Sequence, residues 1–242
     1  MPRRVHSYDR GAEETVSYSR LQQQLPAFLR RYVLHFEAAI DDSVSRFSTS
    51  LADRSRVLDA GAGEGKFAAA FARQRYTGVD LGIGDTDWNY AGLDALADLE
   101  RLPFRDDAFD ACINIVTLEH VREPAAVVKE LYRTLKPGGM ILLVTPHEWE
   151  EHQQPHDYFR YTRFGMEYLL MNAGFTGLVI EPVGGFFRLL SRRLLNGLQF
   201  FPGVWVIPAA LVLVPPALLL PLFDALDERR NFTLGYVCTA RK

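Results

Sequence analysis

The fold is decided by nine consecutive residues, Val57-Leu58-Asp59-Ala60-Gly61-Ala62-Gly63-Glu64-Gly65. The apolar run that ends at Ala60 predicts a buried strand, and a helical pattern begins near Lys66. Glycines between a strand and a helix permit a tight turn and let a ligand approach the backbone. The N–H groups at the helix start are then available to an anionic or polar group. This stretch therefore predicts a nucleotide-type binding loop.

The spacing of these glycines separates the loop from two related kinds. It reads GxGxG, whereas dinucleotide-binding proteins carry GxGxxG and phosphate-binding P-loops end in GK[ST]. Both of those alternatives are weakened, and an NAD-dependent reductase remains only a third reading of the chain.

Short apolar runs alternate with helical patterns from Arg56 onward. The strand candidates are Val57 to Ala60, Tyr76 to Val79, Leu93 to Ala97, Phe109 to Val116, Met140 to Thr145, Phe175 to Glu181 and Phe232 to Ala240. Helices are expected within the first fifty residues, before a polar break at Ser43 to Arg54, and at Lys66 to Gln74, Ala125 to Leu135 and Thr162 to Ala173. This alternation predicts βαβ units and a parallel sheet.

Two acids follow the second and third predicted strands. Asp80 is placed to accept hydrogen bonds from ribose hydroxyls, because ligands of α/β sheets meet the carboxyl ends of the strands. Asp98 could accept a hydrogen bond from an adenine amino group while Leu99 packs on the ring. Each acid alone could equally be a solvated loop residue. Together with the glycine loop, they predict a nucleoside site.

An ordered set of motifs now resembles the class I S-adenosylmethionine-dependent methyltransferases, specifically their type 11 branch. The motifs are residues 57–65, Gly78-Val79-Asp80, Ala97-Asp98-Leu99, Phe109-Asp110, Leu118-Glu119-His120-Val121 and Leu135-Lys136-Pro137-Gly138-Gly139. The resemblance covers about Arg56 to Glu181. It implies a Rossmann-like, seven-stranded and mostly parallel sheet with a reversed last strand.

The resemblance also implies S-adenosyl-L-methionine as the cofactor. Gly61, Gly63 and Gly65 would hold it, with Asp59 orienting the loop or meeting the cofactor amine through water. The remaining cofactor-binding residues that it implies are Asp80 with Leu81 at the ribose, Asp98 with Leu99 at the adenine, and Asn114 with Ile115 at the methionine end.

The acceptor is expected beside residues 146–161, which hold three of the six histidines next to aromatic and acidic residues. His147 and His156 are the candidates for handling the acceptor proton. Glu119 and His120 resemble a pair that lies near the active site in the family, although a capping role is equally open. A plainer reading has aromatic residues anchor this loop and Arg160 pair with Asp157. No metal is expected, because the histidine spacing is not HExxH.

Composition limits the partners and the compartment. The 242 residues are 48% hydrophobic and carry a net charge of −3, which is typical of a folded protein and gives no basic field for nucleic acid. The amino terminus has no apolar run behind its basic residues, so no secretory signal is expected. Cys112 and Cys238 show no metal-site or disulfide spacing. A cytoplasmic protein is expected, at the inner face of the membrane if the segment described next binds lipid.

A charge-free stretch interrupts this ordinary composition at 194–223. Pro215-Pro216 predicts a break that leaves two short apolar pieces, Val204 to Val214 and Ala217 to Phe223. If the flanking strands pair in one sheet, the segment must return to the side it left, so a re-entrant or interfacial element is favoured over a crossing. Arg188, Arg192, Arg193, Arg229 and Arg230 would then meet the headgroups. An apolar cap on the sheet and the surface of a homodimer are the alternatives.

Four segments follow from these observations. They are an N-terminal helical lid at 1–50, a methyltransferase core at 51–182, the apolar insertion at 183–230 and a final core strand at 231–242. The expected reaction is O-methylation of a glycan or lipid-linked small molecule. C-methylation of an isoprenoid quinone, and a membrane-attached protein that binds the cofactor without catalysis, are the alternatives.

Overall fold

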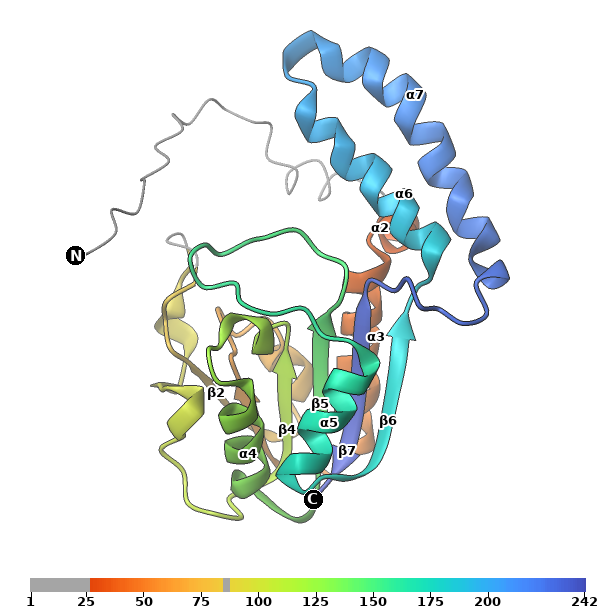
Figure 1. Ribbon diagram of the computed structural model, residues 1–242. Coiled ribbons are helices and arrows are strands. Elements are labelled where there is room, and N and C mark those ends of the chain that lie inside the picture. Colours follow the sequence, from red (N-terminus) through yellow and green to blue (C-terminus); the bar gives the residue numbers. More distant parts are fainter. Residues whose placement is uncertain (1–26, 85–87) are drawn as a thin grey trace, which may run out of the picture.

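A computed structural model describes residues 27–84 and 88–242 of the chain (Figure 1). In this part of the chain seven strands form one sheet in the order β3-β2-β1-β4-β5-β7-β6. The strands are β1 (Arg56–Ala60), β2 (Arg75–Asp80), β3 (Ala95–Leu96), β4 (Phe109–Ile115), β5 (Leu135–Pro146), β6 (Thr176–Val183) and β7 (Gly235–Arg241). β1 to β5 are parallel, and β7 runs antiparallel to both neighbours. The expected sheet with a reversed last strand is confirmed.

Helices cover both faces of this sheet. The α-helices are α2 (Ala27–Val33), α3 (His35–Ser50), α4 (Pro124–Thr134), α5 (Arg163–Ala173), α6 (Phe186–Asn196) and α7 (Val206–Leu219). Short 3-10 turns are η1 (Ala68–Phe71), η2 (Tyr90–Gly92), η3 (Leu99–Arg101), η4 (Leu118–His120), η5 (Gly197–Phe200), η6 (Gly203–Trp205) and η7 (Leu220–Leu226).

Two apolar clusters place the helices. Leu58 of β1 packs in the cluster that includes Leu131 of α4 and Leu170 of α5, while Val57 packs in the one that includes Phe47 of α3. Successive side chains of a strand point to opposite faces, so a central strand covered on both sides is mostly apolar. This explains why the sheet could be predicted from short, largely apolar runs.

Three local predictions were wrong. The segment Lys66 to Gln74 contains only the short turn η1, because Arg75 must already bond to the carbonyl of Ser55 to start β2. The polar break expected from Ser43 is helical as far as Ser50, since the hydroxyls of α3 bond back to carbonyls of their own helix. β5 starts at Leu135 rather than at Met140, and pairs there with Phe109.

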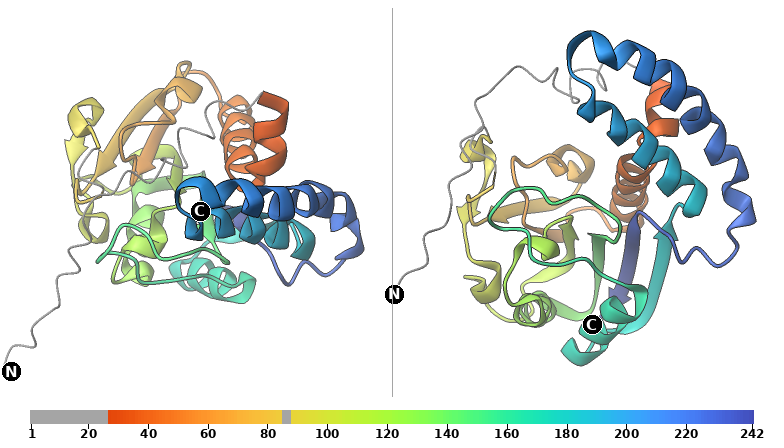
Figure 2. Two further views of the ribbon diagram at one scale, coloured as in Figure 1. Left: turned by 90° about the horizontal axis from the view of Figure 1, so that it is seen from above. Right: turned by 45° about the horizontal axis from the view of Figure 1, so that its top comes forward.

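The insertion between β6 and β7 is a helical hairpin, 186–226 (Figures 1 and 2). α6 forms one arm, α7 with η7 forms the other, and residues 197–205 form the tip. The expected break at Pro215-Pro216 does not occur, and α7 runs through both prolines. Each proline removes the donor to a carbonyl four residues earlier, at Leu211 and Val212, and both of these residues are exposed. The opposite side of α7 is held to α6, where Ser191 Oγ donates to the carbonyl of Ala217 at 2.6 Å.

The base of the hairpin is fixed by acids. One Asp224 oxygen accepts from the backbone N–H groups of Gly185 and Arg188, and Asp227 accepts from that of Phe186. Carboxylates at the start of a helix satisfy N–H groups that have no partner within the helix. These contacts hold the return arm against the start of α6.

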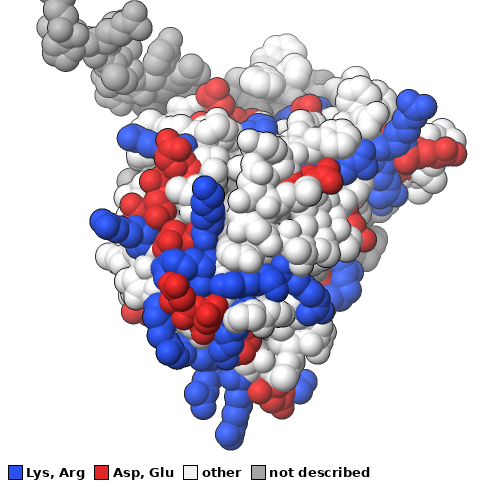
Figure 3. All heavy atoms as spheres, turned by 60° about the horizontal axis from the view of Figure 1, so that its bottom comes forward, with Lys and Arg blue, Asp and Glu red and all other residues white. Residues whose placement is uncertain are grey.

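Three of the arginines expected at headgroups face protein instead. Arg188 pairs with Asp224, Arg192 is buried against Glu37 of α3, and Arg193 pairs with Glu150. Arg229 and Arg230, after the hairpin, are exposed. Figure 3 shows that the opposite end of the molecule carries intermingled acidic and basic side chains.

Candidate active site

A cavity of about 770 Å³ opens at the carboxyl ends of the parallel strands. Its volume falls within the range of pockets that bury small ligands. It is lined by the ends of β1, β2 and β4, by α3 through Phe36, Glu37 and Ile40, and by residues of the segment after β5. The part of the expected N-terminal lid that the structure describes thus forms a wall of the cavity, while residues 1–26 lie outside the described residues.

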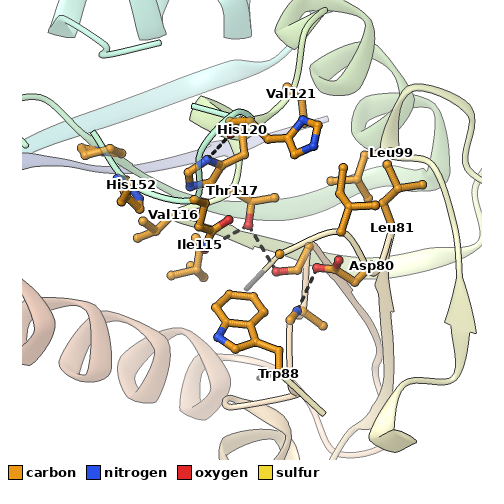
Figure 4. Close-up of a pocket in the computed structure, with 18 of the residues that line it drawn as sticks. Asp80, Leu81, Trp88, Leu99, Ile115, Val116, Thr117, His120, Val121 and His152 are labelled. Carbon is orange, nitrogen blue, oxygen red and sulfur yellow. Dashed lines mark hydrogen bonds between the residues drawn. The ribbon is translucent and has the colours of Figure 1, made fainter. Parts of the chain in front are cut away.

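The glycine loop turns tightly at the floor of this cavity. Gly61 has a φ of +87°, and a Cβ there would collide with the side chain of Thr117. Thr117 Oγ1 donates to the carbonyl of Gly61 at 3.2 Å (Figure 4). Gly63 has a φ of +55° and also lines the cavity, whereas Gly65 turns the chain but is not part of the lining. The loop is therefore open to a ligand that needs close approach to the backbone.

Asp80 joins this loop to the end of β2. Its Oδ2 accepts from the Gly63 N–H at 2.9 Å, and its Oδ1 accepts from the Gly82 N–H at 2.8 Å. Asp80 and the half-exposed Leu81 both line the cavity. A carboxylate held by two amides keeps further lone pairs for a vicinal diol.

Asp98 and Leu99 lie at the same side of the cavity. Asp98 Oδ1 accepts from the Glu100 N–H at 2.9 Å and so caps η3, while Leu99 is 5% exposed. Figure 4 shows Leu99 beside Leu81 and Asp80. This is an apolar wall with an acid at its edge.

Two of the expected cofactor residues lie beneath the cavity rather than in its lining. Asp59 is buried and accepts from the Tyr76 hydroxyl at 2.6 Å, and burial raises its pKa to about 7. The Asn114 amide donates to the carbonyl of Ala60 at 2.7 Å. Asn114 thus holds the residue before the loop, Asp59 joins β1 to β2, and only Ile115 of the pair 114–115 lines the cavity.

The histidines separate into two groups. His120, His152 and His156 line the cavity, and the His156 ring lies 3.1 Å from the Tyr158 hydroxyl. His147 does not line it, because its Nδ1 donates to the Tyr161 carbonyl and its ring packs on Tyr236. His156 therefore stays a candidate for proton handling.

Glu119 is fully buried just behind the cavity wall. Burial raises its pKa to about 8, and burial also lowers the pKa of His120. The backbone carbonyl of Glu119 accepts from the Tyr158 N–H at 2.9 Å, so η4 is joined to the loop after β5. In that loop Arg160 pairs with Asp157 at 2.7 Å, as the plainer reading of the segment expected.

Several lining residues carried no signal in the sequence. Thr117 and Trp88 reach the cavity from loops, and Phe36 with Trp149 forms an aromatic pair at 5.6 Å between ring centroids. Thr117 could have been considered, since it lies two residues after the end of β4. The aromatic residues come together only through the tertiary fold.

Comparison with known families gives one extended match. A family model described as a methyltransferase domain matches residues 31–176. Its description does not distinguish the type 11 branch, so the branch stays a prediction.

Curated relatives match over a shorter segment. An uncharacterised methyltransferase of Mycobacterium leprae is 40% identical over 95 residues, which are 36% of this chain and 35% of that protein. The malonyl-[acyl-carrier protein] O-methyltransferase of Serratia marcescens is 34% identical over 96 residues, 37% of this chain and 38% of that one. The chain thus spans little more than a third of the length of these relatives.

Solved structures share the fold at low identity. The [4+2]-cyclase SpnF gives a TM-score of 0.55 at 23% identity, covering 83% of this chain and 81% of that chain. Phosphoethanolamine N-methyltransferase 2 of Haemonchus contortus, in complex with S-adenosyl-L-methionine, gives 0.53 at 20% identity, covering 79% of this chain and 49% of that one. These likenesses concern the fold.

Proposed function

The chain belongs to the S-adenosylmethionine-dependent methyltransferases of class I, and from this premise we propose that it methylates an oxygen of a lipid-linked small molecule or glycan at a membrane surface. S-adenosyl-L-methionine is the cofactor. When bound, it supplies a methyl group already activated by a sulfonium. The protein then mainly has to align the acceptor and exclude water.

The residues of the cavity fit this cofactor. Gly61 and Gly63 leave room for close approach, and Asp80 presents its carboxylate beside them. Leu81, Leu99 and Trp88 offer apolar surface for a base. Asp80 would hold the ribose and Asp98 the adenine, as the sequence indicates, while Asn114 fixes the start of the loop through the carbonyl of Ala60.

The observation that carries the membrane proposal is the exposed apolar hairpin. Residues Gly203–Leu226 are long and apolar enough to cross a membrane, with a mean hydropathy of 2.3, yet only 11% of the tested window is buried. The exposed side chains include Phe200, Phe201, Val204, Trp205, Ile207, Leu211, Val212, Leu219, Leu222, Phe223 and Leu226. Patches of this kind on a protein surface mark contacts with other molecules or with lipid.

The topology favours a hairpin that enters one face of a bilayer. β6 and β7 pair with each other in the sheet, so the hairpin leaves and returns on the same side. The carbonyls of Leu211 and Val212 lack their helical donors and would bond to water, which favours interfacial depth over the hydrocarbon for this part of α7. Arg229 and Arg230 would meet the headgroups.

The hairpin and the cavity lie at the same end of the molecule. Figure 1 shows the hairpin at the end toward which β4 and β5 point, and the cavity opens at the carboxyl ends of these strands. The two are also in contact, because Arg192 of α6 pairs with Glu37 and lies over the Trp149 ring, and both of these residues line the cavity. An acceptor held in the interface that the hairpin enters would therefore be near the cavity mouth. His156 is placed to take its proton.

Two other functions remain as alternatives. The acceptor atom could be a carbon of an isoprenoid quinone, since the same apolar surface would meet that lipid. The chain could also bind the cofactor without transferring methyl. SpnF, a [4+2]-cyclase, has this fold, so the fold alone does not prove methyl transfer.

Flotation with lipid vesicles tests the role of the hairpin. We expect the full chain to float with vesicles that contain anionic lipid, and Trp205→Glu with Leu211→Glu to abolish flotation. Phe164→Glu on α5 is the matched control, because Phe164 is also exposed but lies outside the hairpin. Equal flotation of the double variant, or a soluble dimer whose contacts cover the hairpin, would refute membrane binding.

A further inference from the structure

Three side chains from two separate loops meet at the edge of the cavity. Glu119 and His120 come from η4, and His152 comes from the segment after β5. One ligand atom of each side chain lies within 4.8 Å of those of the other two. Figure 4 shows His120 and His152 on the cavity wall, away from Asp80.

The hydrogen bond of His120 fixes which nitrogen is free. Its Nδ1 lies 2.6 Å from the carbonyl of His156, so Nδ1 carries the proton and donates it. Nε2 then presents a lone pair. It is buried, lies 3.8 Å from Glu119 Oε1, and has no hydrogen-bond partner among the described residues.

His152 has the same arrangement. Its Nδ1 lies 3.1 Å from the carbonyl of Glu150 and 3.4 Å from Asp157 Oδ2, so this nitrogen also acts as the donor and leaves Nε2 free. Histidines that ligate metals typically donate their other ring N–H to a carbonyl or carboxylate. Both rings already carry that second contact.

The carboxylate of Glu119 completes the set. Its side chain is 0% exposed, and neither oxygen has a hydrogen-bond partner in the described part of the chain. A buried carboxyl group without partners is costly and is rarely kept without a role. The nearest arginine, Arg160, is paired with Asp157 through two contacts of 2.7 and 2.8 Å, so its charge is already balanced.

We propose that Glu119, His120 and His152 bind one divalent transition-metal ion of the zinc type at the edge of the cavity. Two imidazole nitrogens and one carboxylate oxygen suit such ions, and three protein ligands leave a coordination position open. Tetrahedral bonds of about 2.0–2.2 Å place ligand atoms roughly 3.3 Å apart, so small side-chain rotations would close the present separations. Because His120 and His152 line the cavity, the open position faces it.

This site differs from a cluster of His147, His152 and His156, whose spacing in the sequence predicts no metal. The structure uses only His152 of these and adds Glu119 and His120, which lie more than thirty positions earlier in the chain. Metal binding also goes beyond the proposed function, since it does not depend on methyl transfer.

Cobalt titration of chelator-treated full-length protein tests the site. We expect one Co²⁺ per chain, with visible d–d absorption that Zn²⁺ displaces. His152→Gln and Glu119→Gln should each weaken binding by at least about tenfold. His147→Gln is the matched control and should bind as the unmodified chain does, because its side chain lies outside the cluster.

Folding is checked by S-adenosylmethionine affinity, which the variants should keep. Absence of Co²⁺ binding by the unmodified chain, or unchanged binding in His152→Gln, would overturn the proposal. His152 is partly exposed, so this variant is informative even if Glu119→Gln fails to fold. Absence of Co²⁺ binding by an unmodified chain that still transfers methyl would refute this inference and leave the proposed function standing.

Discussion

The cofactor cavity and the apolar hairpin use their polar groups in opposite ways. In the cavity, Asp80 and Asp98 are tied to backbone N–H groups. In the hairpin, polar contacts lie at the base, in the seam between the arms and where α6 meets the core, while the outer face of α7 is apolar and exposed. The cavity is thus organised within the chain, whereas the outer surface of the hairpin still needs something to cover it.

The match to a known family includes the region of the cavity and excludes the hairpin. The family match covers residues 31–176 and ends before the hairpin at 186–226. The matched part explains which cofactor is used. The hairpin is therefore the part of this chain that should distinguish its acceptor from those of other members of the family.

The largest expected effect concerns the buried acid below the loop. The pKa of Asp59 is raised to about 7 by burial, above its ordinary value of 3.8. The folded protein therefore favours the neutral acid, and its stability is full below pH 4 and falls as the pH rises toward 7. Between these pH values, the free energy of unfolding should fall by on the order of 4 kcal/mol. Asp59→Asn should remove this loss.

Urea unfolding between pH 4 and pH 8 measures the effect. The unmodified chain should lose more stability over this range than Asp59→Asn, in which the buried Glu119 still titrates, while both float with vesicles. Parallel pH profiles for the two proteins would show that Asp59 does not titrate as described.

The next effect concerns the glycine loop. Gly61→Ala should lower the free energy of unfolding by about 2–4 kcal/mol, because the new methyl meets Thr117 and the residue has positive φ. Gly177→Ala is the control, since Gly177 has a φ of +60° but no atom within 4 Å of a Cβ. It should cost only about 1 kcal/mol. Equal losses in denaturant unfolding would contradict the close packing of the loop on Thr117.

The smallest effect concerns the seam of the hairpin. Ser191→Ala removes the hydrogen bond to the Ala217 carbonyl and should increase amide exchange in α7 while lowering stability by about 1 kcal/mol. S-adenosylmethionine affinity, measured by calorimetry, should stay the same. A clear loss of cofactor affinity would show that the packing of the hairpin seam affects cofactor binding in the cavity.

The sheet and the loop were predictable because their signals are local. Buried strands such as β1 and β4 are short, largely apolar runs, and the positive φ of Gly61 and Gly63 is encoded by glycine itself. The end of α5 at Gly174 was predictable for the same reason, as its φ is +106°.

The errors arose where distant contacts override local preference. Pro215-Pro216 lies within α7 because α6 supports the other side of that helix. His147 was chosen for its position after β5, yet its ring turns to Tyr161 and Tyr236. The meeting of His152 with Glu119 depends on how two loops fold together, and no spacing in the sequence encodes it.

The central claim is that this methyltransferase takes its acceptor from a membrane. Transfer of tritiated methyl from S-adenosylmethionine to a bacterial lipid extract in vesicles tests it most directly, with Asp80→Asn as the variant expected to lose about tenfold or more in cofactor affinity. The account predicts label in the organic phase from the unmodified chain and little from Trp205→Glu with Leu211→Glu. Label confined to water-soluble products, or equal lipid labelling by the hairpin variant, would contradict it.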